Sequence, residues 1–117
     1  MRGIADITHS ERWVVETALK ERYGKPVETQ LADVELRLDP GMPELTPCPA
    51  LVWQERGATF VISKVGDWRY RCQFFYSVRE QYGTGKEEYD DLAECVSALL
   101  RLQADHEVNA MNEFSGE

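Results

Sequence analysis

Residues 50–78 constrain the fold most, because three short hydrophobic runs are separated there by two turn signals. The runs cover residues 50–55, 58–65 and 68–78, with Arg56-Gly57 in the first gap and Val65-Gly66-Asp67 in the second. Runs of this length that are bounded by glycine turns are typical of antiparallel strands. The segment therefore predicts a three-stranded antiparallel meander.

The first turn also predicts a register. A two-residue turn at positions 56–57 pairs Trp53 with Phe60 and Leu51 with Ile62, so all four side chains share one face. Because these side chains are large and apolar, we expect that face to pack against the core.

For the second turn, a three-residue loop at positions 65–67 pairs Ile62 with Tyr70 and Phe60 with Cys72. This register buries more apolar surface than a two-residue turn, which would place Ile62 opposite Arg71. The side chains that it directs to the other face are Arg69, Arg71, Gln73 and Phe75, beside Val52, Gln54 and Val61.

Helices are expected on both sides of the meander. Thr8 and Glu11 have the spacing of a capping box, and an apolar helical pattern continues to Gly24, which predicts a helix over residues 9–23. A second apolar stripe, behind a start rich in carboxylates, predicts a helix over residues 87–106. Residues 109–117 are polar and are expected to fray.

The segment between the first helix and the meander divides into a strand and a loop. Residues 33–38 alternate between polar and apolar, which predicts a half-buried strand. Residues 39–49 contain four of the five prolines and predict an irregular surface loop, in which Cys48 could be exposed.

Together these elements predict an α+β fold: a four-stranded, largely antiparallel sheet with an N-terminal and a C-terminal helix packed on one face. The other face is expected to be open. We expect one domain over residues 1–108, followed by the tail. The predicted inner face consists of Leu36, Leu51, Trp53, Phe60, Ile62, Tyr70 and Phe74.

The charge balance excludes polyanionic partners. Thirteen Lys and Arg against 21 Asp and Glu give a net charge of −8, which opposes binding to nucleic acid or to an anionic membrane. There is no apolar run of membrane-spanning length and no signal-peptide pattern at the N-terminus, and the three cysteines form no Cys-x-x-Cys pair. These features predict a cytoplasmic protein with reduced thiols.

The sequence provides no complete catalytic, cofactor or metal motif. Gly83-Thr84-Gly85-Lys86 precedes a helix, but Glu stands at positions 80 and 87, where a phosphate loop needs Gly and Ser or Thr. His9 and His106 lack a second ligand at helical spacing. Cys72 and Cys95 are expected to be inert packing groups, which leaves Cys48 as the candidate reactive thiol.

The element order resembles, in outline, that of the double-stranded-RNA-binding domain, which docks the basic start of its last helix across phosphates. Here that start reads Lys86-Glu87-Glu88-Tyr89-Asp90-Asp91, so the sign of its charge is opposite. No functional residue is therefore transferred from that family.

These observations favour a small acidic protein-interaction module, such as an adaptor, small chaperone or inhibitor, without catalytic activity. The expected partner is another protein or a second copy of the chain, with no cofactor and no metal. Two alternatives stay open: an inhibitor that mimics nucleic acid through its C-terminal helix, and an enzyme or ligand carrier with a site near the proline loop. The predicted interaction surface consists of Arg69, Arg71, Phe75 and Gln54, because basic and apolar groups coincide there.

Overall fold

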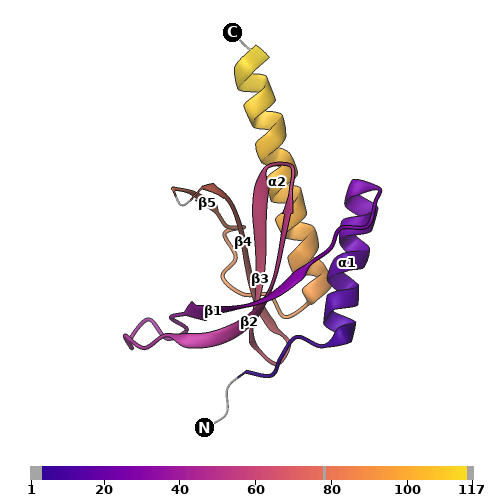
Figure 1. Ribbon diagram of the computed structural model, residues 1–117. Coiled ribbons are helices and arrows are strands. Elements are labelled where there is room, and N and C mark those ends of the chain that lie inside the picture. Colours follow the sequence, from indigo (N-terminus) through magenta and orange to yellow (C-terminus); the bar gives the residue numbers. More distant parts are fainter. Residues whose placement is uncertain (1–3, 78, 116–117) are drawn as a thin grey trace.

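The computed structural model describes residues 4–77 and 79–115 (Figure 1). A five-stranded antiparallel sheet, with strand order β1-β2-β3-β4-β5, packs against two helices that lie on one of its faces (Figure 1). The α+β architecture is as predicted, but the sheet has five strands instead of four. The elements are α1 His9–Tyr23, β1 Gln30–Leu36, β2 Thr46–Glu55, β3 Ala58–Gly66, β4 Arg69–Ser77, β5 Glu80–Tyr82 and α2 Leu92–Ser115.

The first helix has the predicted bounds, because its local end signals are complete. The Thr8 backbone N–H donates to the Glu11 carboxylate over 2.7 Å, and the Glu11 N–H donates to the Thr8 hydroxyl over 3.1 Å. Gly24 ends the helix in the left-handed conformation at φ 73°, which glycine adopts without a steric penalty.

The β2–β3 hairpin has the predicted register. Trp53 pairs with Phe60 and Leu51 pairs with Ile62 around a two-residue turn. Both turn residues have positive φ, 57° for Arg56 and 78° for Gly57, as the favoured two-residue hairpin turn requires.

The predicted register of the β3–β4 hairpin is wrong. Ile62 pairs with Cys72 and Phe60 pairs with Phe74, which is a shift of two residues along β4. The reason is a bulge between Lys64 and Gly66, followed by a turn in which Gly66 pairs with Arg69. A shift of two residues keeps every side chain on its predicted face.

The predicted proline loop is too long, because β2 already begins at Thr46. Pro47 and Pro49 pair opposite Glu35 and Asp33 of β1. Strand β3 pairs with β2 only from Ala50 onward, so one edge of this segment is unpaired and prolines can occupy it without losing a ladder hydrogen bond. Cys48 lies between these prolines and is buried, so its thiol does not have the exposure that a surface loop would allow.

The sequence predicts an open second face of the sheet, and in the structure this face is open only in part: Gln54 and Gln73 on it are exposed. Cys48, Ala50 and Ser63 lie on this face and are buried, although both helices pack on the other one. Leu36 also belongs to this outer face, because it shares a side of β1 with the partners of Cys48 and Ala50. Its predicted place on the inner face is therefore wrong.

The sequence did not predict the short strand β5, and the start of α2 also differs from the prediction. Residues 87–91 are not helical, because Tyr89 forms a two-bond antiparallel bridge with Tyr70 at 2.8 and 2.9 Å. Asp91 then caps α2 by accepting the N–H groups of Ala93 and Glu94. The helix continues to Ser115 and projects beyond the sheet (Figure 1), and the division of the chain at residue 108 stays a prediction.

The core lies between the sheet and the two helices. Both helices contribute to one cluster with the inner face of the sheet, and Thr29, next to this cluster, is buried with its hydroxyl donating to Glu16 over 2.7 Å. The buried side chains of the cluster are Val15, Leu19, Leu51, Trp53, Ala58, Phe60, Ile62, Tyr70, Phe74, Tyr89, Leu92, Cys95, Val96, Leu99 and Leu100. Neither helix, over its described residues, combines the length and apolar character needed to cross a membrane.

Candidate binding pocket

A cavity lies where the starts of both helices meet the tip of the β3–β4 hairpin. Its volume is about 560 Å³, which falls in the range of small-ligand and side-chain pockets. We call it the hairpin pocket. Its lining residues are Thr8, Ser10, Glu11 and Val14 near the start of α1, Lys64, Asp67, Trp68 and Tyr70 of the hairpin, and Asp90, Asp91, Leu92 and Ala93 at the start of α2.

A buried ion pair forms the floor of the hairpin pocket. Lys64 is 5% exposed, and its ammonium group donates to the Glu11 carboxylate over 3.1 Å and to the Asp6 carbonyl oxygen over 3.0 Å. The hydroxyl of Tyr70 donates to the other oxygen of the same carboxylate over 2.5 Å. The floor is therefore electrically neutral and its charged groups have partners.

These contacts set the protonation of the floor. Burial alone would raise the pKa of Glu11, but hydrogen bonds from Tyr70, Thr8 and Lys64 outweigh it and hold that pKa below its ordinary value. Burial and the neighbouring carboxylate raise the pKa of Tyr70. Near neutral pH, Glu11 is ionised and Tyr70 is a neutral donor.

The rim of the hairpin pocket is acidic. Asp67, Asp90 and Asp91 are exposed and line the pocket, and Asp91 is engaged as the cap of α2. Within the described part of the chain, neither Asp67 nor Asp90 forms an ion pair. Since Lys64 is neutralised by Glu11, the rim keeps a net negative charge.

Trp68, at the edge of the pocket, combines an exposed side chain with a strained backbone. Its side chain is 73% exposed, and its backbone has φ 60°, a conformation that bulky residues rarely adopt. Burial therefore does not explain this tryptophan, and neither does the conformational preference of the turn. Strained backbone at an exposed aromatic residue is a feature of functional sites.

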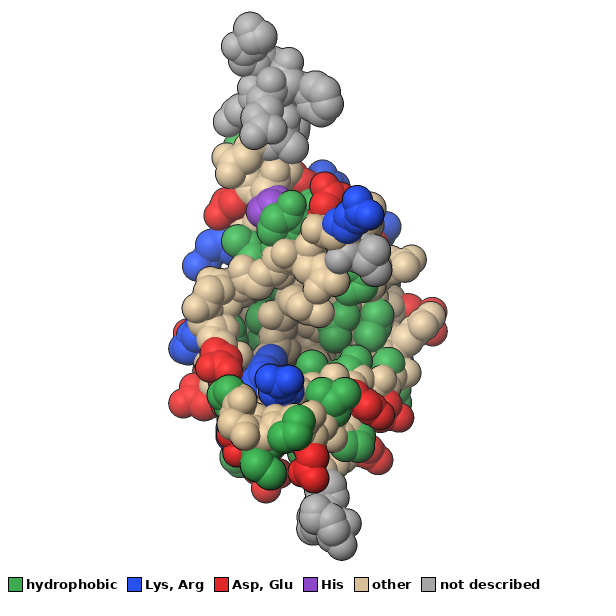
Figure 2. All heavy atoms as spheres, turned by 90° about the vertical axis from the view of Figure 1, so that its left-hand side faces the viewer, with side chains coloured by type: hydrophobic (Ala, Val, Ile, Leu, Met, Phe, Trp, Pro, Cys, Tyr) green, Lys and Arg blue, Asp and Glu red, His purple; other side chains and the backbone are tan. Residues whose placement is uncertain are grey.

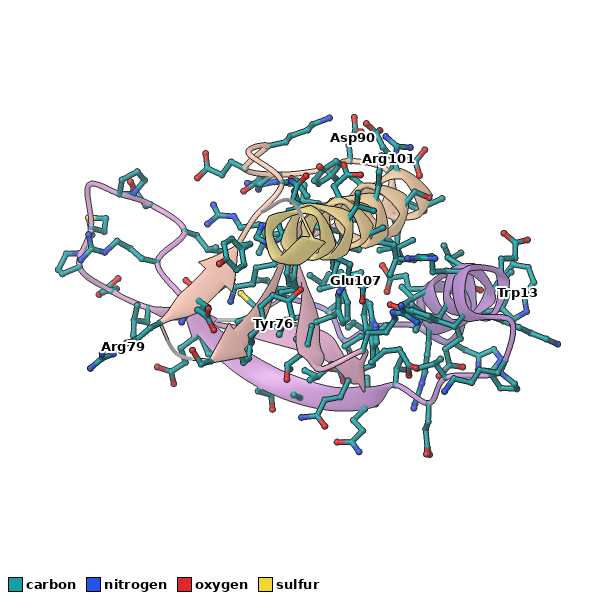
Figure 3. The ribbon with its side chains drawn as sticks, turned by 90° about the horizontal axis from the view of Figure 1, so that it is seen from above. Trp13, Tyr76, Arg79, Asp90, Arg101 and Glu107 are labelled. Carbon is teal, nitrogen blue, oxygen red and sulfur yellow. The ribbon has the colours of Figure 1, made fainter. Side chains whose placement is uncertain are left out.

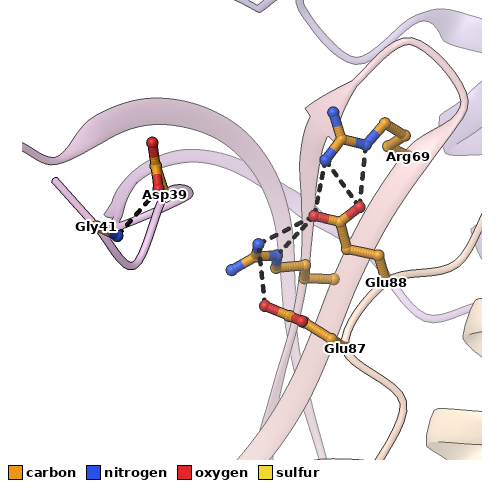
Figure 4. Close-up of polar contacts among 6 residues, drawn as sticks. Asp39, Gly41, Arg69, Glu87 and Glu88 are labelled. Atoms are coloured by element: carbon orange, nitrogen blue, oxygen red, sulfur yellow. Dashed lines mark hydrogen bonds and ion pairs between the residues drawn. The ribbon is translucent and has the colours of Figure 1, made fainter.

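The predicted interaction residues lie at a different place, and two of them are held by carboxylates (Figure 4). Arg69 and Arg71 both donate to Glu88, with N–O distances from 2.9 to 3.2 Å, and Arg71 also lies 3.4 Å from Glu87. Burial would raise the pKa of Glu88, but the two guanidinium groups lower it. Phe75 is half-buried and Gln54 is exposed.

The outer face of the sheet contains a second, smaller hollow of about 360 Å³. We call it the outer groove. It is lined by Leu36, Val61, Ser63, Arg71, Cys72 and Gln73 of the sheet and by the 83–87 loop. Figure 2 looks onto this side of the molecule, where hydrophobic side chains gather below a recessed centre. Of the four predicted interaction residues, Arg71 alone lines the outer groove.

The candidate metal and nucleophile residues are not brought together. In the described ranges, no group of three His, Cys, Asp or Glu side chains is arranged to hold a metal ion. His106 packs against Tyr82 with ring centroids 4.0 Å apart, beside Phe74 and Tyr76. Burial raises the pKa of the Cys48 thiol, which opposes its predicted reactivity.

Searches against protein-family models, curated proteins and solved structures found no match to this chain.

Two signals in the sequence could have revealed the hairpin pocket. Lys64 follows Phe60 and Ile62 at the same alternation, so the pattern that buries those residues also directs a lysine inward. Trp68 follows Gly66-Asp67, a place where turn residues are expected instead of an aromatic one.

Proposed function

We propose that this protein is a non-catalytic binding module that accepts a basic segment of a partner protein in the hairpin pocket. An apolar side chain of the segment would enter the pocket against Val14, Tyr70 and Leu92. Its cationic neighbours would contact the carboxylates of Asp67 and Asp90.

The observation that carries this proposal is the exposure of Trp68 together with its backbone strain. The residue is exposed and backbone-strained beside an apolar pocket. Tryptophan is enriched among the residues that dominate protein interfaces, and its ring face also attracts Arg and Lys. A partner that packs against Trp68 would account for a residue that costs the isolated fold stability.

Charge complementarity selects the class of partner. The rim offers unpaired carboxylates, the only lysine in the lining is neutralised by Glu11, and the whole chain has a net charge of −8. This field favours the approach of cationic segments and disfavours acidic ones.

The test is a pair of short fluorescein-labelled peptides, one alternating arginine with leucine and the other alternating glutamate with leucine, measured by fluorescence anisotropy. We expect the arginine peptide to bind and the glutamate peptide not to bind. Trp68→Gly should weaken binding of the arginine peptide by about tenfold or more, which corresponds to about 1.4 kcal/mol. The double variant Asp67→Asn, Asp90→Asn should also bind the arginine peptide less tightly than the parent. This loss should grow as the salt concentration falls, because the attraction between charges is then screened less.

Two matched controls separate this site from general attraction to an acidic protein. Trp13 is 63% exposed, lies on the outer side of α1 (Figure 3) and does not line the hairpin pocket, so Trp13→Gly should bind as the parent does. Asp105→Asn removes the same charge as Asp90→Asn from an exposed position outside the pocket. Equal losses in the site and control variants would overturn the proposal.

The outer groove supports a second candidate, binding through the surface of Arg69, Arg71, Phe75 and Gln54. It is favoured by the hollow that Arg71 lines, with a second copy of the chain as its occupant. The two arginines would first have to leave Glu88. An Arg71→Glu, Phe75→Ser variant that is folded and associates as the parent does in light scattering would refute this candidate.

A further inference from the structure

Two of the three cysteines lie next to each other across the interface between the sheet and α2. Cys72 is on β4 and Cys95 is in the first turn of α2. The sulfur of Cys72 is 3.9 Å from the backbone carbonyl oxygen of Cys95. Both thiols are free in this structure, although they are far apart in the sequence.

The two cysteines differ in exposure. Cys72 is half-buried and its side chain lies on the inner face, packed against the core beside α2, whereas Cys95 is fully buried. A small oxidant therefore reaches Cys72 before Cys95.

The two thiols also influence each other's ionisation. Their interaction lowers the pKa of Cys72 and raises that of Cys95. A partly exposed thiol of lowered pKa beside a second thiol is the usual arrangement of a peroxide-sensitive cysteine and its resolving partner.

We propose that Cys72 and Cys95 are a peroxide-responsive thiol pair that closes to a disulfide. In the first step the sulfur of Cys72 attacks hydrogen peroxide, the O–O bond breaks, and a sulfenic acid and one water form. In the second step the sulfur of Cys95 attacks the sulfenic sulfur and displaces a second water. The two thiols are oxidised by two electrons in total, and the peroxide is reduced to two waters.

The disulfide would join the segment between its two cysteines into a closed loop. That segment contains β5, Glu88, and Asp90 and Asp91 of the hairpin pocket rim. Closing the loop removes conformational entropy from the unfolded chain, so the oxidised protein should unfold at a higher temperature.

The experiment treats the full chain with a small excess of hydrogen peroxide, blocks the remaining thiols, and maps the peptides by mass spectrometry without reductant. We expect a Cys72–Cys95 linked peptide, an unmodified Cys48, and a thermal midpoint that rises by several degrees and returns with reductant. No linked peptide after complete loss of free Cys72 thiol, or Cys48 linked to either residue in equal yield, would overturn the proposal.

Serine variants provide the controls. Cys95→Ser should leave Cys72 as a sulfenic acid that dimedone traps, and its thermal midpoint should not rise on oxidation. Cys48→Ser should respond as the parent does, since Cys48 is buried in β2. If Cys95→Ser fails to fold, the same trapping applied to Cys72→Ser must give no adduct at Cys95, and an adduct there would contradict the assigned order of attack.

Discussion

Each of the two turns of the central meander contains a large residue with positive φ, but the two residues differ in their contacts. In the β2–β3 turn, Arg56 has φ 57° and its guanidinium donates to Glu107 of α2 over 2.7 Å. In the β3–β4 turn, Trp68 has φ 60° and is 73% exposed. The strain at Arg56 therefore accompanies a contact within the fold, whereas the strain at Trp68 accompanies none that buries its ring.

In the proposed function, this difference marks the turn whose backbone strain serves binding. An arginine that anchors a turn to a helix has a structural explanation. An exposed tryptophan beside an apolar pocket with an acidic rim is better explained by a partner. The following predictions test whether the two ends of the meander differ in this way.

The largest effect is expected at the floor of the hairpin pocket. Lys64→Met leaves the Glu11 carboxylate buried without its cation and should lower the free energy of unfolding by about 3 kcal/mol. Glu107→Gln breaks the exposed pair at the other turn and should change it much less. Urea titrations of both variants measure this contrast, and similar losses would contradict it.

The second prediction concerns acid. The pKa of Glu11 is held below its ordinary value of 4.5, so between that folded value and 4.5 the unfolded chain binds more protons than the native one. Its contribution is therefore present above pH 4.5 and is lost as the pH falls through the folded pKa. Glu11→Gln should show a shallower decline of the free energy of unfolding below pH 4.5 than the parent; an unchanged slope would contradict this reading.

A smaller effect, of opposite sign, is expected at Trp68. Trp68→Gly relieves the left-handed backbone and should raise the free energy of unfolding by about 0.5 to 1 kcal/mol, even though it should weaken peptide binding. Chemical denaturation together with the anisotropy assay measures both quantities. A destabilised Trp68→Gly variant would show that the ring is part of the fold.

The smallest effect is expected at Arg56. Arg56→Gly relieves the same kind of strain but also removes the contact with Glu107, so the two changes should nearly cancel. The thermal midpoint should stay close to that of the parent. A rise as large as that of Trp68→Gly would remove the distinction between the turns.

Local sequence determined the elements whose signals are complete within a few residues. The bounds of α1 follow from three residues near its ends. Thr8 and Glu11 form the capping box that starts the helix, and Gly24 ends it in the left-handed conformation. The register of β2 with β3 follows from the Arg56-Gly57 turn and the facing aromatic residues. The faces of β4 were also predictable, because the alternation of its side chains survives a shift of two residues.

Tertiary structure decided what depends on partners distant in the chain. Tyr89 pairs with Tyr70 instead of entering α2, because a free strand edge competes for its backbone hydrogen bonds. Cys48 and Leu36 lie on the outer face because the helices cover the opposite one. The short strand β5 forms because β4 offers it an edge. The hairpin pocket likewise combines Glu11, Lys64 and Asp90 from three separate segments, so the local signals at Lys64 and Trp68 do not show which residues meet there.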